Sequence, residues 1–86
     1  MEVVLYGPLR GVTGEKTVTV PFEGGTVEEA IAAYVTAYPR AHDQLFTDDD
    51  SLRPSVRVQC DGETVTATDP CPAEASLTLF PAVQGG

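Results

Sequence analysis

The sequence predicts an α+β domain, in which a single helix covers one face of a mixed β-sheet in the order β-β-α-β-β-β. Short stretches of alternating apolar and polar residues, a pattern typical of strands, recur before and after one stretch with helical periodicity. Eight glycines and seven prolines among 86 residues indicate many tight turns between short elements. An apolar fraction of 42 % argues against disorder, and the length allows one small domain.

The first two elements are predicted to be strands joined by a loop. Glu2 to Tyr6 alternates along its length, and Lys16 to Phe22 places valines between threonines. The segment between them, Gly7 to Gly14, is rich in turn-forming residues, so we expect a loop there rather than a helix. Pro21 has no amide donor, and its place near the end of the second strand indicates an edge strand.

A helix is predicted to follow Gly24 and Gly25. Thr26 and Glu29 have the spacing of a capping box, in which the threonine hydroxyl accepts from the Glu29 amide and the Glu29 carboxylate accepts from the threonine amide. Pro39 ends the predicted helix. The apolar residues between these limits recur at the spacing of one helical face: Val27, Ala30, Ile31, Tyr34, Val35 and Tyr38.

Residues 41–52 form a polar segment, in which we expect one turn of helix that packs Phe46 on the core. The acidic loop that follows, Asp48 to Asp50, lacks the spaced oxygen ligands and the turn glycine of a calcium-binding loop, so we expect no metal site. His42 is the only histidine, and a lone histidine in a polar segment is expected at the surface rather than as a base or ligand.

The second half of the sequence predicts three more strands. Ser55 to Cys60 alternates apolar and polar residues, and Asp61-Gly62 predicts a type I′ hairpin turn because both positions tolerate a positive φ. The returning strand is Glu63 to Ala67, a loop is expected over Asp69 to Pro72, and the last strand is Ser76 to Phe80.

The predicted core gathers the apolar side chains that these patterns turn to one side. Each of them contributes about 1.5–3 kcal/mol when buried, before the loss of chain entropy is subtracted. The predicted members are Val3, Leu5, Val18, Val20, Val27, Ile31, Val35, Phe46, Val56, Val58, Leu77 and Leu79.

The charge is strongly unbalanced, with thirteen acidic residues against five basic ones and a net charge of −8. An acidic surface repels phosphate groups, so we expect neither nucleic acid nor a membrane as a partner; a basic groove on another protein fits better. Many acids with one lysine are typical of a halophilic protein in a salt-rich cytoplasm, and an ordinary acidic domain is the alternative.

Two cysteines, Cys60 and Cys71, are too few for a disulfide scaffold and lack the C-x-x-C spacing. We expect two free thiols in a reducing cytosol, and therefore a cytoplasmic protein without a signal peptide. A bridge between these two cysteines stays open, because an oxidised pair could staple a small domain.

The sequence contains no glycine-rich nucleotide loop, no metalloprotease motif and no nucleophile elbow, so we expect no enzyme and no cofactor of its own. The remaining feature is the carboxyl end, where the last strand leads through Pro81, Ala82, Val83 and Gln84 to Gly85 and Gly86.

Taken together, these features resemble the ubiquitin-like β-grasp proteins, in particular the group of small archaeal modifier proteins and small subunits of molybdopterin synthase. The resemblance covers the whole chain and rests on the element order, the Gly-Gly-Thr-Val-Glu-Glu-Ala helix start, the Asp61-Gly62 hairpin and the terminal diglycine. That family usually has Phe-Pro-Pro-Val and a small residue before the diglycine. Here Ala82 replaces the second proline and Gln84 the small residue, so we expect a less stiff tail.

The resemblance implies a β-grasp domain over residues 1–81, with the first and last strands parallel at the sheet centre, and a flexible tail over 82–86. It also implies an E1-like activating enzyme that adenylates the Gly86 carboxylate. A protein modifier is then joined by an isopeptide bond to lysines of target proteins. The alternative is a sulfur carrier, whose terminal thiocarboxylate serves the large subunit of molybdopterin synthase or tRNA thiolation.

Docking on the activating enzyme is expected on the sheet face away from the helix. Strand alternation places Tyr6, Arg57, Gln59, Thr78 and Phe80 there, and Phe80 is the expected anchor beside the tail. The expected docking set is Arg57, Phe80, Pro81, Ala82, Val83 and Gln84. Lys16, the only lysine, is a candidate acceptor for another modifier, and a binding module with an incidental diglycine is the non-covalent alternative.

Overall fold

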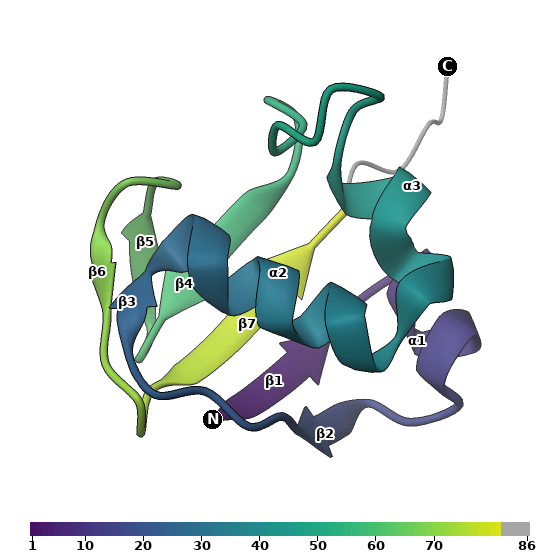
Figure 1. Cartoon of the computed structure of the whole chain (residues 1–86). Coiled ribbons are helices and arrows are strands. Elements are labelled where there is room, and N and C mark those ends of the chain that lie inside the picture. Colours follow the sequence, from purple (N-terminus) through teal and green to yellow (C-terminus); the bar gives the residue numbers. More distant parts are fainter. Residues whose placement is uncertain (82–86) are drawn as a thin grey trace.

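A five-stranded sheet carries the long helix α2 on one face in the computed structural model, which describes residues 1–81 (Figure 1). The strand order is β2-β1-β7-β4-β5, with β1 and β7 parallel at the centre and the other neighbours antiparallel. The α+β class is thereby confirmed, and so is the parallel central pair. The strands are β1 (Glu2–Leu5), β2 (Thr17–Thr19), β4 (Arg57–Cys60), β5 (Glu63–Val65) and β7 (Ser76–Phe80).

Helix α2 (Val27–Ala37) begins with the predicted capping box. The Glu29 amide donates to the Thr26 hydroxyl at 3.2 Å, and the Thr26 amide donates to the Glu29 carboxylate at 2.8 Å. The helix ends before Pro39, where a short 3₁₀ turn η1 (Pro39–Ala41) and α3 (His42–Leu45) follow. Phe46 then packs on the core with 5 % of its surface exposed, as the sequence predicts.

A second, two-stranded sheet joins β3 (Gly25–Thr26) to β6 (Pro70–Cys71), where the sequence predicts only a loop. The same crossing segment supplies backbone partners to the first turn of α2, since the Val27 amide donates to the Asp69 carbonyl and the Glu28 amide to the Ala67 carbonyl, both at 2.9 Å. These two amides have no partner within the helix, so their capture fixes the crossing segment against the helix start.

The segment after β1 is helical, not a loop as predicted: α1 spans Pro8–Thr13. Proline fits the first turn of a helix because its missing amide would be unpaired there, and Leu9 is fully buried. Gly14 closes the helix in the left-handed region at φ 78°, with its amide donating to the Arg10 carbonyl. The buried leucine stabilises a helix too short to form alone.

The predicted edge strand and hairpin are both present. β2 lies at the edge of the sheet and is shorter than expected, with β5 at the opposite edge. Asp61 and Gly62 have φ angles of 51° and 87°, the positive values that a type I′ turn requires. The Asp61 carboxylate also accepts from the Ser76 amide at 3.0 Å, which ties the hairpin to β7.

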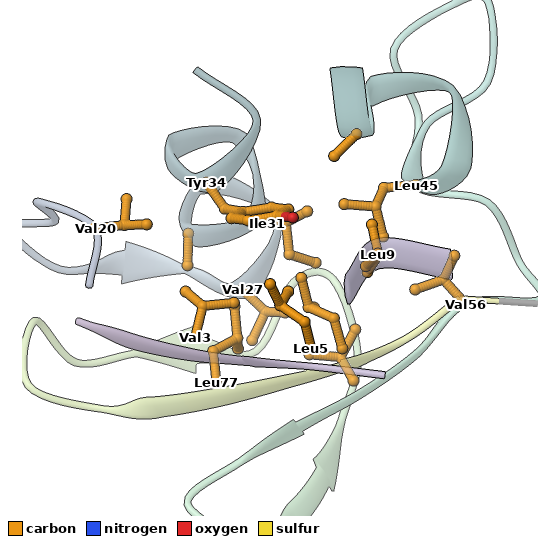
Figure 2. Packing of buried hydrophobic residues seen from close by; sticks show 14 of the residues in the cluster. Val3, Leu5, Leu9, Val20, Val27, Ile31, Tyr34, Leu45, Val56 and Leu77 are labelled. Carbon is orange, nitrogen blue, oxygen red and sulfur yellow. The ribbon is translucent and has the colours of Figure 1, made fainter. Parts of the chain in front are cut away.

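The core lies between the sheet and the helices (Figure 2). Every predicted core residue is buried except Val35, which is half-buried at the flank of α2. Most of the buried apolar residues absent from the predicted core come from segments that the sequence predicts to be loops or turns. Two others, Tyr34 and Ala30, come from the predicted helical face. Together these residues are Leu9, Ala30, Tyr34, Ala41, Leu45, Cys60, Cys71 and Ala75.

Candidate docking face and carboxyl end

The central strand β7 ends at Phe80, which belongs to an aromatic pair on the sheet face away from the helices. Tyr6 and Phe80 stack with ring centroids 4.6 Å apart and planes 25° apart. The parallel register of the two central strands explains the stack, because Leu5 pairs with Leu79 and each ring belongs to the next residue along. The Tyr6 amide donates to the Leu79 carbonyl at 3.2 Å, which holds the first ring in place.

Two cations flank this aromatic pair. The Lys16 ammonium lies 5.7 Å from the centre of the Tyr6 ring, a cation–π distance, and the Lys16 carbonyl accepts from the Leu5 amide at 2.7 Å. Arg57 lies on the other side, paired in register with Phe80. We call this surface the Tyr6–Phe80 face, and it consists of Tyr6, Lys16, Arg57, Gln59, Thr78 and Phe80.

A groove of about 400 Å³ lies beside Phe80 on this face. Its lining combines apolar side chains with the Arg57 guanidinium, and it borders the edge strand β5. The lining residues are Val56, Arg57, Val58, Gln59, Thr64, Val65 and Phe80. A groove that combines apolar and polar side chains with one cation suits a partner that presents an apolar side chain next to a carboxylate.

The helix side of the molecule carries charges of the opposite sign. A groove of about 340 Å³ runs there past α2 and α3, where the acidic residues Glu28, Glu29 and Asp50 flank an apolar lining that includes Val35 and Phe46. His42 also lines it, with its ring nitrogens 3.0 Å from the Asp43 carboxylate and 2.8 Å from the Asp50 carboxylate. Hydrogen bonds to these two carboxylates raise the pKa of His42.

Neither surface brings together the ligands of a metal ion among the described residues. Within residues 1–81 no three histidine, cysteine or acidic side chains meet at a spacing that could hold a metal ion. The acidic loop at 48–50 is exposed, and Thr47 and Ser51 hydrogen-bond with it. No helix in the described part of the chain has the length and hydrophobicity that a membrane crossing requires.

The structure places Phe80 beside Arg57, two members of the predicted docking set, and a third member, Pro81, is buried directly after β7. A buried proline fixes the direction in which the chain leaves the sheet. The other predicted residues, Ala82, Val83, Gln84, Gly85 and Gly86, lie outside the described residues.

Sequence reasoning missed that Lys16 belongs to this face. The sequence suggests for its exposed side chain only the role of an acceptor amine. The contact with Tyr6 depends on how the chain returns from α1 to β2. Pairs of a lysine and a tyrosine separated by a short helix carry no local signal, so only the tertiary structure reveals this contact.

Comparison with known proteins gives consistent matches over the full length. The profile of the ThiS family matches residues 3–86. Small archaeal modifier protein 1 of Haloferax volcanii is 37 % identical over 87 residues, which cover 100 % of this chain and 100 % of that protein.

Two solved structures agree with these matches. The crystal structure of the Haloferax volcanii protein has a TM-score of 0.89 and 36 % identity, covering 100 % of this chain and 98 % of that one. A chain of the Amycolatopsis orientalis BexX/CysO complex has a TM-score of 0.78 and 28 % identity, covering 99 % of this chain and 98 % of that one.

Proposed function

This chain belongs to the ThiS family, and we propose that it is a ubiquitin-like protein modifier: an E1-like enzyme adenylates the Gly86 carboxylate, which is then joined by an isopeptide bond to lysines of target proteins. The observation that supports this proposal most directly is the full-length similarity to small archaeal modifier protein 1, at 37 % identity. The chain acts in this scheme as the substrate of the activating enzyme, not as a catalyst.

The chemistry explains why such a substrate ends in glycine. A free α-carboxylate has a pKa of about 3.3–3.7, so it is anionic near neutral pH and a poor electrophile. Adenylation replaces the charge by a mixed anhydride with AMP, from which an amine or a sulfur nucleophile can displace the nucleotide. Gly85 and Gly86 carry no Cβ, so they can enter a narrow channel and adopt any backbone angles that the attack requires.

The folded domain supplies a surface on which the activating enzyme can dock, directly before residues 82–86 in the chain. Residues 82–86 span at most about 17 Å when fully extended, so the activating enzyme must bind the domain close to its adenylation site. The Tyr6–Phe80 face fits this requirement, because Phe80 ends β7 immediately before the buried Pro81. We therefore propose that the domain ends at Pro81 and that residues 82–86 extend from it into the adenylation site.

The charge pattern indicates which face the partner selects. Lys16 and Arg57 flank the aromatic pair, whereas carboxylates line the groove on the helix side. A partner surface with an apolar pocket rimmed by carboxylates would be attracted to the first face and repelled by the second. Because adenylation consumes ATP, we propose that this encounter takes place in the cytoplasm.

Sulfur carriage is the second candidate function. The family match and the similarity to a chain of the BexX/CysO complex favour it. The acyl adenylate is common to both routes, and each attack releases AMP: a lysine amine gives the isopeptide, and sulfide gives a terminal thiocarboxylate. The recipients would then be the large subunit of molybdopterin synthase or an enzyme of tRNA thiolation.

The deciding experiment incubates the chain with its E1-like enzyme, ATP and Mg²⁺, with and without sulfide, and records intact masses together with conjugates in a cell extract. A modifier leaves a remnant of Gln-Gly-Gly or longer, linked by an isopeptide bond to target lysines, and a carrier gives a free chain heavier by the difference between sulfur and oxygen. A variant lacking Gly85 and Gly86 is the matched control. If that variant works in cells as well as the full chain, both proposals are wrong.

A further inference from the structure

The two cysteines lie in separate elements and are both buried. Cys60 is the last residue of β4 and is 9 % exposed, and Cys71 is the last residue of β6 and is 1 % exposed. The proposed function uses neither thiol, because the reacting carboxylate belongs to the other end of β7: Cys60 pairs with Leu77, near the start of that strand, and Arg57 pairs with Phe80 at its end.

The topology brings the two thiols to the same place. The Ala75 amide donates to the Pro72 carbonyl at 3.1 Å, so the chain reverses immediately after Cys71 and enters β7 at Ser76. Cys60 faces the core next to this strand start, and both cysteines belong to the same cluster of buried residues. Burial raises the pKa of both thiols, and the Asp61 carboxylate and the neighbouring thiol shift these values further.

We propose that Cys60 and Cys71 form a reversible intramolecular disulfide that joins β4 to β6 when the chain meets a small-molecule disulfide such as oxidised glutathione. One cysteine thiolate attacks the glutathione disulfide, forms a mixed disulfide and releases one glutathione thiolate. The second cysteine thiolate then attacks the mixed disulfide and releases the other. Each protein thiol loses a proton, and the two electrons that the protein gives up reduce one glutathione disulfide to two glutathione thiols.

The bridge would close the segment that contains β5 and the backbone groups that hold the start of α2. The Asp69 and Ala67 carbonyls, which accept from the first amides of the helix, lie inside the closed ring. Oxidation therefore fixes the two-stranded sheet and the helix start to the main sheet, and it leaves the Tyr6–Phe80 face unchanged. Burial raises the pKa of Cys71 to about 11, so few thiolates are present and the bridge forms slowly, when the two-residue strand β6 opens.

An equilibrium measurement tests this proposal without depending on the slow rate. The full chain is brought to equilibrium in a series of glutathione redox buffers, once under native conditions and once in denaturant, and the oxidised fraction is read from intact mass. If the fold holds the thiols together, the equilibrium constant for bridging is at least about tenfold larger in the native chain than in the denatured one. An equal or smaller native constant would overturn the proposal.

Location and specificity are tested on the same samples. Cleavage after Glu63 separates the two cysteines, so the two fragments stay joined only when the intramolecular bridge is present. The single variants Cys60→Ser and Cys71→Ser should give separate fragments in every buffer. The oxidised chain should also unfold at a temperature higher than the reduced chain, by roughly 10 °C. Disulfide-linked dimers, or two glutathione adducts on one chain, would count against the proposal.

Discussion

Tyr34 and Phe46, on the helix side of the sheet, are 0 % and 5 % exposed, whereas Tyr6, on the opposite side, is 40 % exposed and stacks on Phe80. Helices cover only one face of the sheet (Figure 1), and the core between them contains Tyr34 and Phe46. The covered rings stabilise the fold by leaving water. The uncovered rings keep apolar area that is partly exposed, and we propose that a partner buries this area on binding.

Leu79 and Phe80 test this difference most directly, because they are neighbours in β7 and point to opposite faces. Leu79 is fully buried between Leu5 and Val58, its partners in the adjacent strands. We expect Leu79→Ala to lower the free energy of unfolding by about 2–5 kcal/mol, measured by denaturant titration. A loss below about 1 kcal/mol would contradict the role that we assign to the covered face.

Phe80→Ala should show the reverse pattern. We expect it to lower the free energy of unfolding by at most about 1.5 kcal/mol, because the ring is half-buried and loses mainly its stack with Tyr6. Adenylation should suffer more, with kcat/KM reduced by a factor of about 30, as for an interface residue worth about 2 kcal/mol. Tyr38→Ala, which removes a half-buried ring outside the Tyr6–Phe80 face, is the control and should leave kcat/KM unchanged. Equal effects of both variants on kcat/KM would contradict the assignment of Phe80 as the anchor.

Arg57→Glu examines the charge of the exposed face. We expect slower association with the activating enzyme, by a factor of about 3–10 at low salt, and a difference that shrinks as salt screens it. Arg10→Glu, which makes the same charge change on α1, is the matched control. Stopped-flow association rates at several salt concentrations measure both variants, and identical salt dependence of the two would show that the location of the charge is irrelevant.

The smallest expected effect concerns the helix side. Both ring nitrogens of His42 face carboxylates, so both can donate only when the imidazole is protonated. Its pKa is raised in the folded chain, so the stabilisation is complete below the unfolded value of about 6.5 and is lost as the pH rises through the folded value. Equilibrium unfolding across this range should show the decline in the wild type and a flatter profile in His42→Gln. Parallel profiles would mean that the contacts with Asp43 and Asp50 do not stabilise the fold.

Local patterns were sufficient for the elements of the main sheet and for α2. The capping box of Thr26 and Glu29 and the positive φ angles of Asp61 and Gly62 are properties of a few consecutive residues, and the sequence shows them directly. The parallel pairing of β1 and β7, in contrast, came from the family resemblance, because strand alternation alone does not specify which strands are neighbours.

The errors share a physical cause, which is stabilisation by distant residues. α1 forms because Leu9 is buried against the rest of the core, and β6 pairs for only two residues with β3, far earlier in the chain. The same limit applies to the exposed face: alternation placed Arg57 and Phe80 on one side, and the cation–π contact of Lys16 depends on a return path that no local pattern indicates.

The parallel pairing of β1 with β7 determines how copies of this chain would be arranged in a genetic fusion. Glu2 pairs with Ser76 and Leu5 with Leu79, so the amino terminus and the exit at Pro81 lie at opposite poles of the molecule. A fluorescent label or a purification tag at Met1 would therefore lie far from the end of the molecule at which the chain leaves the sheet after Pro81. In head-to-tail genetic fusions, successive domains should form an extended chain and should not fold back on one another.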